Sequence, residues 1–84
     1  MNRITIKYFA SIREALGQGA ETVHTTAATI AALRAELMAR GGAYAEVLAA
    51  HKAVRVAVNQ TMAEESTPLT DGAEVAFFPP VTGG

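Results

Sequence analysis

The last residues of the chain contain its clearest candidate for chemistry, a carboxylate. Thr82 offers only a weak hydroxyl nucleophile, because no base lies near it in the sequence. Gly83 and Gly84 have no side chains, so the reactive group is the α-carboxylate of Gly84. Glycine lacks a Cβ, so such a carboxylate passes through narrow channels, and its carbonyl is open to attack once AMP is attached as a leaving group. These residues predict a carrier arm whose cargo is bound at Gly84.

Two prolines precede this arm and make it stiff. Pro79 and Pro80 have φ restricted to about −65° and no backbone N–H, so a sheet must end at or just before them. Extended, residues 79–84 reach about 18 Å from the body, far enough to enter another protein's active site. An expression remnant or a loose terminus would explain Gly-Gly alone, but not a rigid stalk before it. We therefore predict a folded domain, residues 1–78, and an extended tail, residues 79–84.

The other residues that could be reactive or bind a metal do not predict a second site. Glu64 and Glu65 are adjacent and point apart, as in a solvated loop. His24 and His51 lack a third ligand, so no metal site is expected. The sequence has no cysteine, which excludes disulfides, thiolate metal sites and a cysteine persulfide.

Composition limits the class of protein. A chain of 84 residues forms one domain with a modest core, too small to enclose a deep active site, so a partner is expected. Hydrophobic residues make up 50% and charged residues 18%, which favours a folded chain. A net charge of −1 provides no basic field, so no nucleic-acid partner is expected. No leader or apolar run of membrane-spanning length is found, which predicts a cytoplasmic protein without a membrane partner.

Periodicity predicts the elements that position the tail. Residues 3–9 alternate as a half-buried strand does, and residues 11–14, SIRE, fit a capping box for a short helix that Gly17 ends. Residues 20–25 form a weaker strand with Val23 inward. The inward residues of the first strand are Ile4, Ile6 and Tyr8.

The main helix follows from Thr29 and ends at Gly41-Gly42, and residues 44–50 allow a further helical turn. The apolar stripe of the main helix is Ile30, Leu33 and Leu37, and Arg34 and Arg40 lie off it.

The C-terminal part returns to strand patterns. Residues 54–58 alternate with their valines inward, residues 59–60 turn the chain, and residues 62–67 can pair briefly. A turn at residues 70–72 leads to a last strand, residues 74–78. The order predicts an α+β roll, one mixed sheet with one main helix across a face.

The first and last strands each leave an aromatic side chain on the open face of this sheet. If Val75 and Phe77 face the helix, Phe78 points away, and Phe9 does the same at the end of the first strand. Neighbouring exposed aromatics usually indicate a protein contact, unless the short helix folds back over them.

Two stretches of the chain resemble the MoaD family of sulfur carriers, the small subunits of molybdopterin synthase. Residues 56–84, VAVNQTMAEESTPLTDGAEVAFFPPVTGG, are similar to the family's C-terminal part, and residues 8–17, YFASIREALG, to its first strand and following helix. Gly-Gly alone is shared with every ubiquitin-like carrier, but FFPPVTGG after LTDGAEVAFF is specific. The resemblance implies a β-grasp fold with the first and last strands adjacent and parallel in mid-sheet.

The resemblance also implies a mechanism. In the family, a ubiquitin-activating-type adenylyltransferase uses ATP to adenylate the terminal glycine, here Gly84, and sulfur then replaces AMP to give a thiocarboxylate. The tail enters the large catalytic subunit, where the sulfur passes to cyclic pyranopterin monophosphate to form molybdopterin. The chain itself would be non-catalytic, with no permanently bound cofactor and only a transient acyl-AMP. The family's synthase is a heterotetramer of two large and two small subunits.

Individual positions of the family's pattern are present. Gly83 and Gly84 match its terminal pair, and Arg13 matches a position that helps dock onto the activating enzyme. Met62 stands where the family typically has leucine, which keeps the apolar character. The apolar docking patch matches Phe9, Met62 and Phe78. The partner-binding tail also includes Pro79, Pro80, Val81 and Thr82.

Other functions stay open at this point. A carrier of the same kind could serve thiamine, cysteine or tRNA thiolation, and its partner and acceptor would distinguish it. A ubiquitin-like modifier would join Gly84 to lysine amines and produce a ladder of heavier species. A plain binding module would keep its function without Gly83-Gly84.

Overall fold

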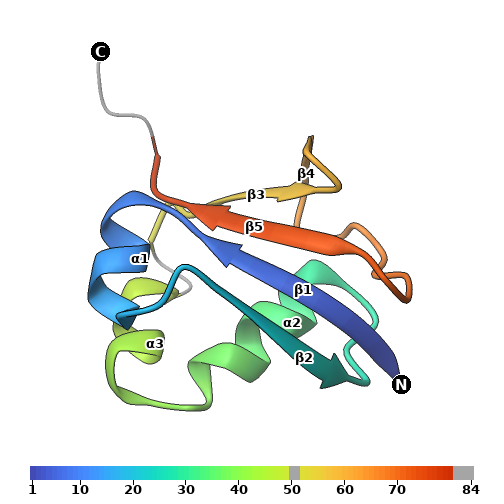
Figure 1. Cartoon of the computed structure of the whole chain (residues 1–84), viewed down its shortest axis with the longest axis horizontal. Coiled ribbons are helices and arrows are strands. Elements are labelled where there is room, and N and C mark those ends of the chain that lie inside the picture. The colour runs from blue at the N-terminus through green and yellow to red at the C-terminus, as the bar shows by residue number, and fades with distance from the viewer. Residues whose placement is uncertain (50–51, 81–84) are drawn as a thin grey trace.

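The computed structural model describes residues 1–49 and 52–80, in which three helices and five strands follow one another (Figure 1). The elements are β1 (Asn2–Tyr8), α1 (Ala10–Leu16), β2 (Ala20–Thr25), α2 (Ile30–Met38), α3 (Gly42–Val47), β3 (Arg55–Val58), β4 (Thr61–Ala63) and β5 (Glu74–Phe78). The α+β class expected from the sequence is confirmed. None of the helices in the described ranges is long and apolar enough to cross a bilayer.

The sheet joins the two ends of the described chain at its centre. Its five strands lie in the order β2-β1-β5-β3-β4. β1 and β5 are parallel, with Ile6 opposite Val75 and Tyr8 opposite Phe77, and every other neighbouring pair is antiparallel. The expected parallel pairing of first and last strands in mid-sheet is therefore confirmed. Because the two strands run in the same direction, they end at the same edge of the sheet.

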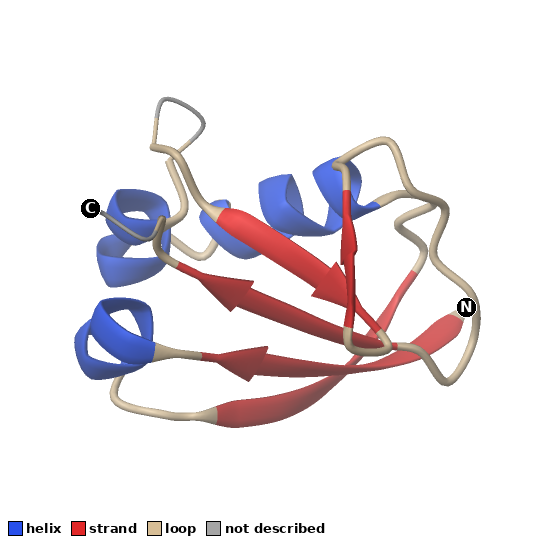
Figure 2. Cartoon of the chain, turned by 90° about the horizontal axis from the view of Figure 1, so that it is seen from above, coloured by secondary structure: helices blue, strands red, loops and turns tan. Residues whose placement is uncertain are grey.

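The helices close one face of the sheet over a single core. Figure 2 shows α2 and α3 on one side of the strands and α1 at the end of the sheet. The inward positions of β1 and β5 and the stripe of α2 meet between these layers, as their periods of two and 3.6 residues predict. The fully buried apolar side chains are Ile4, Ile6, Tyr8, Ile30, Leu33, Leu37, Leu48, Val75 and Phe77.

The start of α1 differs from the capping box predicted at residues 11–14. The helix begins at Ala10, and its N-cap is Phe9, which is extended and has no side-chain cap. Phe9 N donates to Phe77 O, and Phe9 O accepts from the amides of Ile12 and Arg13. The hydrogen bond to β5 therefore holds Phe9 directly after the end of β1, where its carbonyl is the first helix acceptor, and this leaves Ser11 inside the helix. The predicted end is confirmed, because Gly17 is left-handed with φ 74°.

Arg34 is the main departure from the predicted pattern of α2. The helix begins as expected, with Thr29 Oγ1 accepting from Ala32 N at 3.2 Å. Arg34 was expected off the apolar stripe, yet it is only 4% exposed. The side chain is buried because its guanidinium donates to the carbonyls of Leu48 and Ala49, at 2.7 and 2.6 Å.

The same guanidinium ties two further segments to α2. It donates to Lys52 O at 3.0 Å and pairs with Glu65 at 2.8 Å. Glu65 lies in an exposed turn, as the sequence predicts, and from there it serves as the ion-pair partner of Arg34. Arg34 thus binds the connection between α3 and β3 at residues 48–49 and again at Lys52.

The ends of the shorter elements shift by a few residues from their predicted positions. Gly41, with φ 77°, separates the two helices, but Gly42 already belongs to α3. The further turn was predicted for residues 44–50, and Ala50 lies outside the described residues. β4 is shorter and earlier than residues 62–67, because the Asn59-Gln60 turn, with φ 50° and 69°, leads directly into pairing with β3.

Candidate functional site

The tail leaves the domain at the end of its central strand. β5 ends at Phe78, immediately before Pro79 and Pro80, as the missing proline N–H groups require. Pro79 is half-buried and Pro80 is exposed. The remaining predicted tail residues, Val81, Thr82, Gly83 and Gly84, lie outside the described residues. The tail is thus attached to the central strand of the sheet, which has β1 on one side and β3 on the other.

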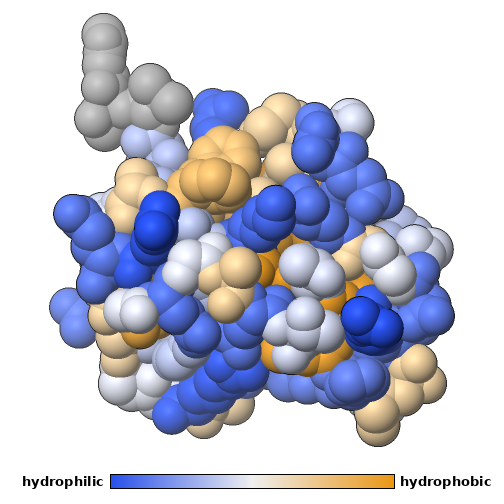
Figure 3. All heavy atoms as spheres, viewed as in Figure 1, coloured by the Kyte–Doolittle hydropathy of each residue, from blue (hydrophilic) through white to orange (hydrophobic). Residues whose placement is uncertain are grey.

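Phe9 and Phe78 lie together beside this exit. Phe9 is 46% exposed and Phe78 is half-buried, so α1 does not cover the pair. Their ring centroids are 6.3 Å apart with planes at 83°, an edge-to-face contact. Apolar side chains gather on this face over the C-terminal end of β5 (Figure 3). The two aromatics therefore form a fixed apolar surface at the base of the tail.

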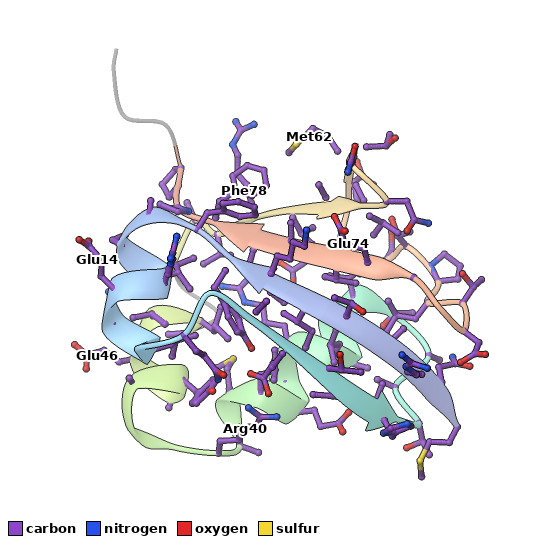
Figure 4. All side chains as sticks on the ribbon, in the orientation of Figure 1. Glu14, Arg40, Glu46, Met62, Glu74 and Phe78 are labelled. Carbon is purple, nitrogen blue, oxygen red and sulfur yellow. The ribbon has the colours of Figure 1, made fainter. Side chains whose placement is uncertain are left out.

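Met62 lies on the same face, two strands away. It is 53% exposed, and Figure 4 shows Met62 and Phe78 directed outward from the same side of the sheet. The register places Met62 opposite Ala57, and Ala57 opposite Ala76. The two alanines, each 8% exposed, separate Met62 from the aromatic pair. We call Phe9, Met62 and Phe78 the open-face patch, and the two alanines lie between its members on the same face.

Arg13 lies apart from this patch. It is exposed on α1, and its side chain packs over Gly19, where a Cβ would come within 3.0 Å of Arg13 Nε. Arg13 is therefore directed toward the connection between α1 and β2. A partner that contacts both Arg13 and the open-face patch must extend around the end of α1.

Two cations near the tail were not foreseen as site residues. Arg55 of β3 lies opposite Phe78 in the strand register. Lys52 lines a surface groove together with Pro79 and Pro80. Among the described residues neither cation takes part in a salt bridge, whereas Lys7 pairs with Glu74 at 3.5 Å. The available signal in the sequence was position. Lys52 lies shortly before β3 and Arg55 lies within it, and β3 is next to the strand that carries the tail.

A polar cluster, in which Tyr8 is buried, Glu21 partly buried and Arg40 exposed, lies on the helix side of the sheet. Tyr8 Oη donates to Glu21 Oε2 at 2.7 Å, and Arg40 Nη1 donates to both oxygens of Glu21 at 3.0 Å. Burial, and then the hydrogen bond to Glu21, raise the pKa of Tyr8 far above its usual value. Tyr8 therefore stays a neutral donor that links β1 to β2. Its role is structural, because its hydroxyl is taken up by this contact.

No metal centre forms in the described ranges. Within residues 1–49 and 52–80, no three His, Cys, Asp or Glu side chains gather in a way that could hold an ion. His24 is exposed on β2, and His51, the other member of the pair in the sequence, lies outside the described residues. The site is thus an apolar surface with a tail and two free cations, an arrangement suited to docking.

Known proteins are similar to this chain in both sequence and fold. A family model described as the ThiS family matches residues 6–84. The molybdopterin synthase sulfur carrier subunit of Escherichia coli (strain K12) is 46% identical over 81 residues, which cover 96% of this chain and 99% of that protein.

Solved structures give the same result for the fold. SAMP1 from Haloferax volcanii has a TM-score of 0.78 at 27% identity, with 99% of this chain and 100% of that chain covered. A complex of subunits 1 and 2 of the molybdopterin-converting factor from Helicobacter pylori 26695 contains a chain with a TM-score of 0.69 at 25% identity, with 98% and 99% covered.

Proposed function

The chain belongs to the ThiS family, and on that premise we propose that it is the sulfur carrier subunit of a molybdopterin synthase. The likeness along almost the whole chain to the Escherichia coli sulfur carrier subunit carries this proposal. The central position of β5 supports it, because a tail attached to a mid-sheet strand is held firmly at its base. The chain is a carrier and a docking module, with no catalytic group of its own.

The chemistry proposed for the tail takes place at the Gly84 carboxylate. One carboxylate oxygen attacks ATP, pyrophosphate leaves, and the product is an acyl adenylate. Sulfide from a donor then attacks the carbonyl and displaces AMP, and loss of a proton gives the thiocarboxylate. In the large subunit the sulfur passes to cyclic pyranopterin monophosphate, and water restores the carboxylate. This chain contributes an unhindered terminal carbonyl and a stiff arm that positions it.

Two partners follow from this chemistry. The large synthase subunit receives the loaded tail, in keeping with the complex of subunits 1 and 2 of the Helicobacter pylori factor. An adenylyltransferase of the ubiquitin-activating type loads it, with Arg13 as part of that contact. We propose a synthase of two large and two small subunits. The open-face patch, with its exposed Phe9 and Met62, supplies the apolar contact for the large subunit.

Intact-mass measurement tests the loading step directly. The protein is incubated with ATP, an adenylyltransferase of this type and a sulfide donor, and a chain that lacks Gly84 is the control. We expect a mass gain equal to one oxygen replaced by sulfur, confined to the C-terminal peptide and absent from the control. An unchanged mass, with an enzyme that loads the Escherichia coli subunit in parallel, would contradict the carrier function.

A protein modifier is the second candidate, because the fold is also that of the small archaeal modifier protein 1 from Haloferax volcanii. Such a modifier forms an amide between Gly84 and a lysine of another protein. Denaturing gels of cells that express an epitope-marked chain would then show a ladder that disappears without Gly84. A single band together with restored molybdopterin synthesis supports the sulfur carrier.

A further inference from the structure

A groove lies at the base of the tail, on the helix side of the sheet. Ser11 and Ala15 of α1 line one side, residues 52–54 line the other, and Pro79 and Pro80 complete the lining. Its volume is about 390 Å³, enough for one or two large side chains. It is more enclosed and more apolar than three other hollows on the described surface.

The groove and the open-face patch lie on opposite sides of the tail. Phe78, at the end of β5, belongs to the open face, where it contacts Phe9. Val47 and Val54, which line the groove, pack against the core beneath the helices. The base of the tail therefore has an apolar surface on each side.

We propose that this groove is a second docking subsite for the large synthase subunit. An apolar side chain of that subunit fills the groove, and a carboxylate of the same subunit lies next to it. The proposal rests on the proposed function, in which the large subunit takes up the tail. A protein that encloses an extended tail must surround it, so it must contact the body on both sides of Pro79 and Pro80. The open-face patch provides one of these contacts, and the groove is the surface available for the other.

The charge at the rim of the groove indicates the carboxylate. Lys52 is exposed and lines the groove, whereas Arg55, opposite Phe78 in the strand register, lies on the open face. Among the described residues Lys52 has no acidic partner, so it is free to meet one from outside. Apolar walls next to an unpaired cation select a segment that is apolar at its tip and acidic beside it.

The wall opposite α1 is held in place before any partner binds. Arg34, itself 4% exposed, donates to Ala49 O and Lys52 O at 2.6 and 3.0 Å. These contacts position the main chain from which residues 52–54 continue into β3. A groove whose wall is anchored in this way costs little ordering entropy when it is filled.

Binding of the full-length chain to the purified large subunit, measured by calorimetry, tests the subsite. Ala15→Phe fills the groove from an exposed helix position, and Ala35→Phe makes the same change on the exposed side of α2. Lys52→Glu reverses the charge at the rim, and Arg3→Glu makes the same change at an exposed position on β1. Thermal unfolding of each variant establishes that it is folded.

We expect Ala15→Phe and Lys52→Glu each to weaken binding by about tenfold. Ala35→Phe and Arg3→Glu should stay within about twofold of wild type. The loss from Lys52→Glu should shrink as salt rises from about 0.05 to 0.5 M, because the interaction is electrostatic.

Wild-type affinity of both groove variants, with binding weakened in Met62→Asp, would overturn the subsite and leave the proposed function intact. Absence of binding by the wild-type chain would instead overturn the proposed function. A wild-type dimer in solution that Ala15→Phe dissociates would assign the groove to a second copy of this chain and overturn the proposal.

Discussion

Met62 allows the docking role of the open-face patch to be tested without disturbing the core. It is 53% exposed on the short edge strand β4, so replacing it removes contact area while the fold is kept. We expect Met62→Asp to weaken binding to the large subunit by about tenfold to thirtyfold, because it places a charge in an apolar interface. The free energy of unfolding should change by less than about 0.5 kcal/mol.

Thr22→Asp is the matched control for that change. Thr22 is exposed on β2 and pairs with Thr5 on the open face, at the opposite edge of the sheet from β4. Calorimetric titration and thermal unfolding of both variants complete the comparison. Equal loss of affinity in the two variants would mean that the effect is one of net charge and that the patch has no specific role.

The residues of the site differ in how readily the sequence predicts them. Strict alternation in RITIKYF and EVAFF placed Phe9 and Phe78 on the open face, and the structure has them there in contact. Met62 was recognised only by its resemblance to a family position. Lys52 could not be predicted as part of a groove, because that depends on how α1 packs against a segment far away in the sequence.

At the scale of elements, Arg34 is the side chain that joins α2 to the connection between α3 and β3. Replacing it by methionine keeps most of the apolar stem but leaves the carbonyls of Leu48, Ala49 and Lys52 without their donor. We expect Arg34→Met to lower the free energy of unfolding by about 3 kcal/mol, because buried acceptors lose charged donors. Urea unfolding measures the loss.

A second variant separates the carbonyl contacts of Arg34 from its ion pair. Glu65 is 49% exposed, so Glu65→Gln should cost less than about 1 kcal/mol. Hydrogen exchange should quicken in β3 of Arg34→Met and stay unchanged in Glu65→Gln. If the two variants are equally unstable, the ion pair is the main contribution and the carbonyl contacts are secondary.

Element types followed from the sequence more reliably than element ends. Period-two and helical patterns depend on which side chains are buried, and that is a property of the local sequence. The start of α1 depends instead on the bond from Phe9 N to Phe77 O, which joins distant residues. The burial of Arg34 likewise depends on carbonyls that only the tertiary fold brings to it.

At the scale of the whole molecule, the proposed function makes the domain a fixed base for the tail. β5 lies between β1 and β3, so the point at which the tail leaves is anchored on both sides. The proposed docking surfaces lie around that same point, with Phe9 on one side and Lys52 on the other. In the proposed complex, docking therefore fixes the origin of the tail, and the number of tail residues sets how far Gly84 reaches.

This coupling predicts that tail length controls sulfur transfer independently of affinity. Inserting one glycine between Thr82 and Gly83 moves the terminal carbonyl by about 3 Å while the docking surfaces stay unchanged. With chains loaded chemically as the thiocarboxylate, transfer in the large subunit should fall by about 100-fold or more, because misplacement of reacting groups by as little as about 1 Å is that costly. Calorimetric affinity should stay within about threefold of wild type.

The control is one glycine inserted in the turn at residues 70–72, at the far end of β5, which should keep both transfer and affinity. Undiminished transfer by the lengthened tail would mean that the large subunit accepts the thiocarboxylate at variable depth. The domain would then hold the tail in place without controlling the position of the thiocarboxylate.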